Sequence, residues 1–68
     1  MIEFKLGDTV LRLTGEFRDD QTIGLTGVVT QLETKEDFMY VRFTNGTTQG
    51  WSAACASEEL KIIKREVR

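Results

Sequence analysis

Alternating apolar and polar residues in the middle of the chain predict a β-strand over residues 38–44. Successive side chains of a strand point to opposite faces, so every second residue shares a side. One side of this strand is apolar and holds Met39, Val41 and Phe43. The other side holds Tyr40 and Arg42. Because the first set carries no charge, we expect it to face the core.

The dipeptide Asn45 and Gly46 follows this strand and precedes a second β-type segment, residues 47–51. An Asn-Gly pair between two strand-forming segments is the strongest short-range signal for a hairpin. We expect a type I′ turn, because Asn and Gly best tolerate the positive φ angles that this turn requires at both central positions.

Three further strands are predicted by β-branched and apolar residues, over residues 9–14, 26–33 and 61–63. Between the first two lies a long polar loop, residues 15–25, and long loops often carry function. Gly27, at the start of its strand, predicts a β-bulge or a close backbone approach. The predicted core is Val10, Leu13, Val29, Leu32, Met39, Val41, Phe43, Leu60 and Ile62, although Leu11 competes with Val10 for the inward position.

Near the C-terminus, residues 57–60 predict a single 3₁₀ turn. Ser57 suits the N-cap of such a turn, and two glutamates follow it in the first turn. A longer helix over residues 57–68 is the competing interpretation. The 68 residues form one domain, which we place at residues 1–63, followed by a basic tail at residues 64–68.

Composition excludes several classes of site. With one cysteine and no histidine, the chain can form neither an internal disulfide nor a Cys/His zinc site, and it lacks the commonest general base. We expect Cys55, among its alanine neighbours, to be buried and inert. We expect Glu16, Asp19 and Asp20 to form a solvated acidic loop. No cofactor and no metal is expected. Short apolar runs, the absence of a signal-type N-terminus and the single thiol predict a cytoplasmic protein without membrane contact.

Charge is unevenly distributed along the chain. Residues 1–60 hold five basic and ten acidic residues, whereas residues 61–68 hold four basic residues and one acidic residue. An acidic body is a poor platform for nucleic acid, because affinity for phosphates depends on many cationic contacts. The basic tail is the exception to this pattern.

The order of the predicted elements resembles the SH3-like small β-barrel, an all-β fold with five strands and one 3₁₀ turn near the C-terminus. Similar motifs recur in Tudor-like and KOW-like domains and in small phage or plasmid proteins. The motifs that carry the resemblance are KLGDTV at residues 5–10, GLTGVV at 24–29, YVRFTNG at 40–46 and ASEEL at 56–60.

The resemblance implies a non-catalytic protein-interaction module, such as a phage- or plasmid-type accessory subunit or an inhibitor of a host factor. SH3-like domains often bind through aromatic residues beside the loop called RT, here residues 15–25. The expected partner-binding residues are Phe17, Arg18, Asp19, Asp20, Tyr40, Arg42 and Trp51. The alternative role for Trp51 is a core position or a barrel-end plug. For Phe17 it is a loop anchor that packs on the barrel, and for Tyr40 with Arg42 it is an ordinary solvent-facing strand pair.

Two other functions stay open. A KOW-like module could bind nucleic acid through its basic C-terminal end, helped by Arg42 and Arg12; the binding residues concerned are Lys61, Lys64, Arg65 and Arg68. A remote alternative is a plasmid-type dihydrofolate reductase, whose SH3-like subunits form a tetrameric pore with a V-Q-I-Y strand segment. The comparable segment here is TQGW at residues 48–51, in which Gly50 replaces the apolar residue. The oligomeric state is not determined by the sequence.

Overall fold

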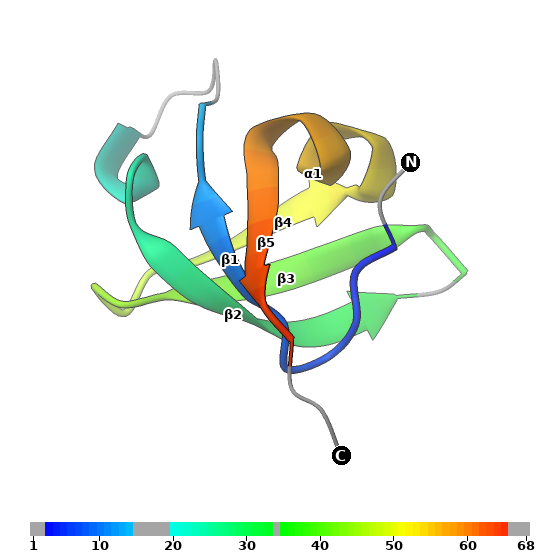
Figure 1. The fold of residues 1–68 in the computed structure, drawn as a ribbon. Helices are drawn as coiled ribbons and strands as arrows, with labels where there is room; N and C mark the ends of the chain where they lie inside the picture. The colour runs from blue at the N-terminus through cyan, green and yellow to red at the C-terminus, as the bar shows by residue number, and fades with distance from the viewer. Residues whose placement is uncertain (1–2, 15–19, 34, 66–68) are drawn as a thin grey trace.

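The structure is a computed structural model of the chain and describes residues 3–14, 20–33 and 35–65. Five antiparallel strands form one sheet in the order β4-β3-β2-β1-β5 (Figure 1). The strands are β1 (Thr9–Arg12), β2 (Thr26–Glu33), β3 (Phe38–Phe43), β4 (Thr48–Ser52) and β5 (Leu60–Lys64). A 3₁₀ turn, η1 (Asp20–Thr22), precedes β2, and a helix, α1 (Ala53–Glu59), connects β4 to β5.

The sheet curls around the core but does not close. β4 and β5 are the two ends of the strand order and do not pair with each other. Instead, α1 packs against both of them (Figure 1). The prediction of an all-β chain with five strands is therefore confirmed at the level of a small antiparallel sheet, whereas the predicted closed barrel is wrong, because β4 and β5 do not pair.

The hairpin between β3 and β4 is confirmed, but its turn differs from the predicted type I′. Gly46 has a φ of 89°, whereas Asn45 is not among the residues with positive φ. The Gly46 N–H donates to the Phe43 carbonyl (2.9 Å) and the Phe43 N–H donates to the Thr47 carbonyl (2.8 Å). These bonds define a three-residue loop with the glycine as a G1 bulge. The Asn45 side chain instead accepts a bond from the Thr47 N–H (3.0 Å), which explains why asparagine suits this position.

The segment after β4 is an α-helix rather than the predicted 3₁₀ turn over residues 57–60. Ser52, not Ser57, is its N-cap, and the Ser52 hydroxyl accepts from the Cys55 N–H (3.4 Å). Ser57 lies inside the helix and donates to the Ala53 carbonyl. The alanines of this segment favour helix more than any other residue type, which the cap-based prediction overlooked. The alternative helix over residues 57–68 is also wrong, because the chain is extended again from Leu60.

Gly27 is a point of close approach, as predicted. A Cβ atom at this position would lie 2.6 Å from Val41 Cγ1 and 2.9 Å from the Arg42 carbonyl oxygen. The β-bulge of this strand lies farther along, between Val29 and Gln31. It allows both Val29 and Leu32 to turn toward the core although they are three residues apart.

Most of the predicted core is buried, with Val10 rather than Leu11 facing inward and Leu32 and Ile62 partly buried at its margin. The prediction that Leu13 belongs to the core is wrong. Leu13 is 50% exposed, because β1 ends at Arg12 and Leu13 lies beyond it. The prediction also omitted three core residues, namely Phe4, Trp51 and Ala56. Within the described residues, no helix is long and apolar enough to cross a membrane.

Candidate interaction surface

One row of residues crosses the solvent-facing side of four neighbouring strands. Arg42 on β3 pairs with Val28 on β2, Val28 pairs with Thr9 on β1, and Thr9 pairs with Lys64 on β5. Their chain neighbours Val41, Val29 and Val10 are buried on the opposite side of the sheet. Strands lie about 4.8 Å apart, so Arg42 and Lys64 stand roughly 14 Å apart at the two ends of this row.

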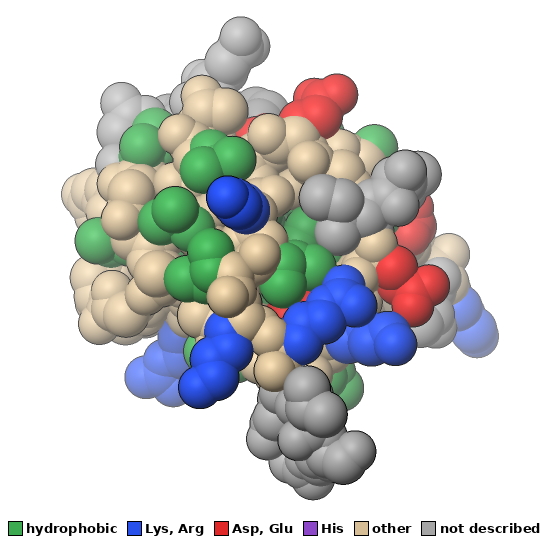
Figure 2. Space-filling view, viewed as in Figure 1, with side chains coloured by type: hydrophobic (Ala, Val, Ile, Leu, Met, Phe, Trp, Pro, Cys, Tyr) green, Lys and Arg blue, Asp and Glu red, His purple; other side chains and the backbone are tan. Residues whose placement is uncertain are grey.

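The centre of this side is apolar. Leu11 is half-buried, Val28 is 41% exposed, and Ile63 is 48% exposed where the pairing of β1 with β5 shifts register. We call the apolar residues Leu11, Val28 and Ile63, with the surrounding basic residues Arg42, Lys61 and Lys64, the outer face. In Figure 2, hydrophobic side chains gather over β1, β2 and β5, and Lys and Arg side chains lie both among them and along the lower side of the same view.

Charge is segregated between strands and connections. In the strand residues that the structure describes, the basic residues are Arg12, Arg42, Lys61 and Lys64, and the single acidic residue is Glu33 at the end of β2. The other described acidic residues lie in turns, in α1 or near the N-terminus. The acidic balance of residues 1–60 therefore conceals a face of the sheet that is locally basic, which a count along the sequence cannot reveal.

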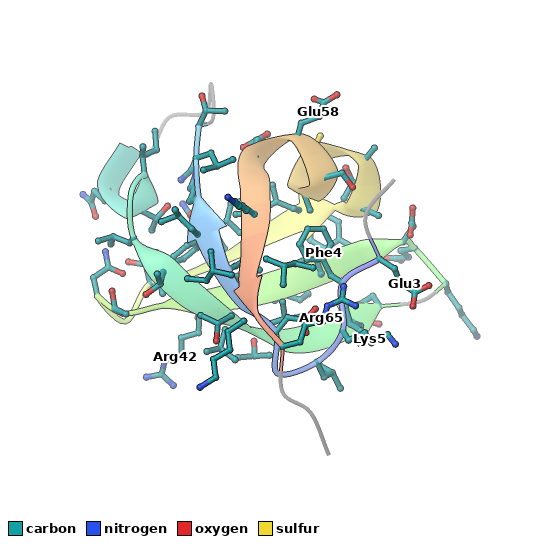
Figure 3. The ribbon with its side chains drawn as sticks, viewed as in Figure 1. Glu3, Phe4, Lys5, Arg42, Glu58 and Arg65 are labelled. Atoms are coloured by element: carbon teal, nitrogen blue, oxygen red, sulfur yellow. The ribbon has the colours of Figure 1, made fainter. Side chains whose placement is uncertain are left out.

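Tyr40 and Arg42 lie on the solvent-facing side of β3, as predicted. Tyr40 packs edge-to-face on Phe38, with 5.3 Å between ring centroids. Both rings lie over Gly50 of β4, where a Cβ atom would be 2.9 Å from Phe38 Cζ and 3.1 Å from Tyr40 Cε1. Arg42 is exposed and points away from the sheet (Figure 3). These two residues therefore share a face, with Arg42 at the margin of the outer face.

Trp51 does not belong to this surface. It is 6% exposed and faces the core opposite Met39, where it packs edge-to-face on Phe43 with 5.8 Å between centroids. The alternation of β4 decides this, because residues opposite each other in paired strands share a face. Among the predicted alternatives for Trp51, the core position is the one that the structure shows.

A buried polar cluster surrounds the indole of Trp51. The Arg12 guanidinium is 2% exposed and lies 5.5 Å from the Trp51 ring centroid. It donates to the Thr22 hydroxyl and to Gln49 Oε1 (3.1 Å), and Nη2 lies 4.0 Å from Glu59 Oε1. Glu59 Oε1 also accepts from Trp51 Nε1 (3.1 Å). This cluster joins η1, β1, β4 and α1 inside the molecule, so Arg12 is not available to a partner at the surface.

The remaining predicted residues are placed only in part by the described structure. Phe17, Arg18, Asp19 and Arg68 lie outside the described residues, and Asp20 begins η1. Lys61 and Lys64 are exposed on β5.

Arg65 follows β5 and is engaged within the chain. It donates to the Glu3 carbonyl (2.6 Å) and lies 3.7 Å from the buried Asp8 carboxylate. Figure 3 shows Arg65 beside Glu3 and Lys5, away from Arg42. Arg65 thus fastens the end of β5 to the N-terminal segment.

The apolar centre of the outer face was missed by the sequence prediction, although the sequence holds a signal for it. Each of the three strands carries two consecutive apolar residues: Val10 with Leu11, Val28 with Val29, and Ile62 with Ile63. In a regular strand only one member of such a pair can face the core. The other members form the exposed centre.

The described residues contain no group of three or more His, Cys, Asp or Glu side chains placed to hold a metal ion. The prediction of a buried Cys55 is wrong: Cys55 is exposed on α1, where Ala56 is the helix residue that faces the core. No family model matches the chain, and a search of curated proteins finds none similar to it.

Proposed function

We propose that this protein is a non-catalytic interaction module that binds another protein through the outer face. The partner surface would present apolar side chains to Leu11, Val28 and Ile63 and carboxylates to Arg42, Lys61 and Lys64. The single observation that carries the proposal is the exposure of Val28 and Ile63 on the side of the sheet that also carries these cations.

This arrangement has the anatomy of a protein-protein interface. Such interfaces have an apolar centre that is desolvated on binding and a polar rim that remains accessible to water. Large aliphatic side chains exposed together on a sheet are otherwise unfavourable. Full burial of each would contribute about 1.5–3 kcal/mol of hydrophobic stabilisation, which the exposed side chain does not gain. Basic residues at the rim would add selectivity for acidic partners and increase the association rate.

The finer fold assignment is part of the same proposal. The strand order, the β3–β4 hairpin and the short helix before the last strand support an SH3-like architecture with an open sheet. Within it, a role as a phage- or plasmid-type accessory subunit or inhibitor of a host factor follows only from the resemblance in sequence.

Nucleic-acid binding is the second candidate, and one observation favours it. Arg42, Lys61 and Lys64 stand on one face that holds no acidic residue among the described strand positions beside them. Two features make it the weaker candidate. The centre between the cations is aliphatic, and Phe38 with Tyr40 pack on each other edge-to-face rather than presenting a flat platform for bases.

A paired substitution tests the proposal. Val28→Asp with Ile63→Asp places carboxylates at the centre of the outer face without removing a core residue. Ala54→Asp is the matched control, since Ala54 is exposed in the first turn of α1, where an acidic residue is tolerated well. Wild type, the double variant and the control are each immobilised and exposed to a host lysate. The captured proteins are quantified by mass spectrometry. The affinity of each immobilised protein for the most enriched captured protein is then measured with purified components.

We expect the control to retain its partner and the doubly substituted protein to lose at least about tenfold in affinity, equivalent to about 1.4 kcal/mol. Circular dichroism verifies that both variants are folded. Equal affinity of all three proteins would refute the outer face as the binding surface. Titration with single-stranded DNA and RNA at several salt concentrations separates the second candidate, which predicts a steep salt dependence that weakens when Lys61 and Lys64 are replaced by Gln.

A further inference from the structure

The two edges of the open sheet differ in how they are protected. β5 carries Lys61 and Lys64 and has an irregular register beside Ile63. Lysines and bulges are the usual means by which natural proteins keep an edge strand from pairing with another chain. β4, with the sequence TQGWS, has no charged residue and no proline. Its register with β3 is regular over all the pairs from Phe38 with Ser52 to Arg42 with Thr48.

The backbone of β4 presents hydrogen-bonding groups at this edge. The Phe43 N–H donates to the Thr47 carbonyl and the Ala53 N–H donates to the Asp37 carbonyl. Hydrogen-bonded pairs alternate along an antiparallel ladder, so Gln49 and Trp51 bond to β3. The N–H and C=O groups of Thr48 and Gly50 therefore point away from β3, toward the edge on which no strand of the described chain is paired.

We propose that β4 pairs antiparallel with β4 of a second copy of this chain, forming a dimer with a two-fold axis at Gly50. In this register Gly50 lies opposite Gly50 of the second copy, Thr48 lies opposite Ser52, and the two sheets become continuous. This interface is separate from the outer face and does not depend on the proposed function.

Charge favours a second copy as the occupant. Antiparallel pairing of a strand with itself brings identical side chains near one another, and like charges in such pairs destabilise a sheet. β4 holds no charge, so self-pairing incurs no such cost. β5, with its two lysines, would repel another β5. Because only one of the two edges is suitable, the assembly closes after two copies and does not extend into a filament.

The aromatic residues beside Gly50 also favour this register. Phe38 and Tyr40 lie over Gly50, which has no side chain to separate them from the edge. Across the two-fold axis lies the Gly50 of the second copy. The Phe38 and Tyr40 rings of the two copies would therefore approach one another above the backbone of the paired glycines. Both rings are only partly buried in the single chain and would lose further exposure. A 68-residue chain without disulfides gains most from such additional burial, because small domains bury little surface by themselves.

The test compares wild type with Thr48→Lys by sedimentation velocity over a range of concentrations. Thr48 is exposed, so lysine there protects the edge without disturbing the core. Val28→Lys adds the same charge to the outer face, and Ala54→Lys adds it to α1 as the matched control.

We expect wild type, Val28→Lys and Ala54→Lys to sediment as a species with twice the 7.7 kDa mass of one chain. We expect Thr48→Lys to sediment as a single chain. Amide exchange at Thr48 and Gly50 should be slow in wild type and fast in Thr48→Lys.

A wild type that remains a single chain at every concentration would overturn the proposal. So would a Thr48→Lys protein that is still dimeric. The proposal would also be overturned if the Val28→Lys protein were a single chain while the Thr48→Lys protein were dimeric, because the outer face would then hold the copies together. Failure of the dimer leaves the proposed function untouched, since the lysate experiment reports on Val28 and Ile63 alone.

Discussion

Removing the carboxylate of Glu59 should destabilise the protein more than removing the guanidinium of Arg12, which lies 4.0 Å away. The Arg12 side chain is 2% exposed and the Glu59 side chain 12% exposed. In Glu59→Gln, the buried Arg12 cation loses the carboxylate that lies 4.0 Å from it. In Arg12→Met, the remaining carboxylate is closer to water and still accepts from Trp51 Nε1.

The magnitude follows from burial and distance. Two charges 4 Å apart interact by about 4 kcal/mol at an effective dielectric constant near 20, and breaking a buried pair typically costs about 3–5 kcal/mol. Because this separation is at the long limit for an ion pair, we expect Glu59→Gln to lose about 3 kcal/mol in the free energy of unfolding, at the low end of that range. For Arg12→Met we expect a loss of about 1 kcal/mol in the free energy of unfolding, since Thr22 and Gln49 keep their mutual hydrogen bond of 2.6 Å.

The assay is urea unfolding, followed by far-ultraviolet circular dichroism and by Trp51 fluorescence. A small domain has an m-value near 1 kcal/mol/M in urea, so Glu59→Gln should lower the midpoint by about 3 M. The double variant should have an unfolding midpoint close to that of Arg12→Met alone. Without Arg12 there is no buried cation, so replacing Glu59 by Gln removes no charge-charge attraction. A Glu59→Gln midpoint within about 0.5 M of wild type, or additive losses in the double variant, would refute this reasoning.

Three further substitutions test the packing of the core, each by thermal and urea denaturation. Trp51→Ala should cost about 3–5 kcal/mol, since the ring is 6% exposed; native stability in this variant would contradict its place in the core. Gly27→Ala should cost about 1–3 kcal/mol, because its Cβ would lie 2.6 Å from Val41 Cγ1. An unchanged melting temperature would mean that β2 and β3 accommodate the added methyl group without loss of packing. Leu13→Gln should change stability by less than about 0.5 kcal/mol, whereas Val10→Ala should cost about 2 kcal/mol; equal losses would show that Leu13 is packed in solution.

The local signals of the sequence predicted the strands well. The alternation of residues 38–44 correctly assigned Met39, Val41 and Phe43 to the interior and Arg42 to solvent. The Asn-Gly dipeptide predicted the hairpin because its cause is local: only Gly46 needs a positive φ, and asparagine caps the turn through its own side chain. The turn type was wrong because the dipeptide signal does not distinguish a two-residue loop from a three-residue loop.

The helix and the surface were harder to predict. The segment of residues 53–56 is small and apolar, and its helical state depends on packing between β4 and β5 as well as on propensity. The predicted partner-binding residues combined Tyr40 and Arg42 with Trp51, which the register of β4 with β3 assigns to opposite sides of the sheet.

By itself, the sequence determined where the chain is extended, where it turns and which side of β3 is apolar, because these features depend on residues within a few positions of one another. Tertiary structure alone decided that Arg12 is buried beside Trp51 and Glu59, although they are 39 and 47 positions farther along the chain. It also decided that cations of β3 and β5 frame Leu11, Val28 and Ile63 on one face. Strand order brings these residues together, and strand order depends on which pairings bury the most apolar surface across the whole chain.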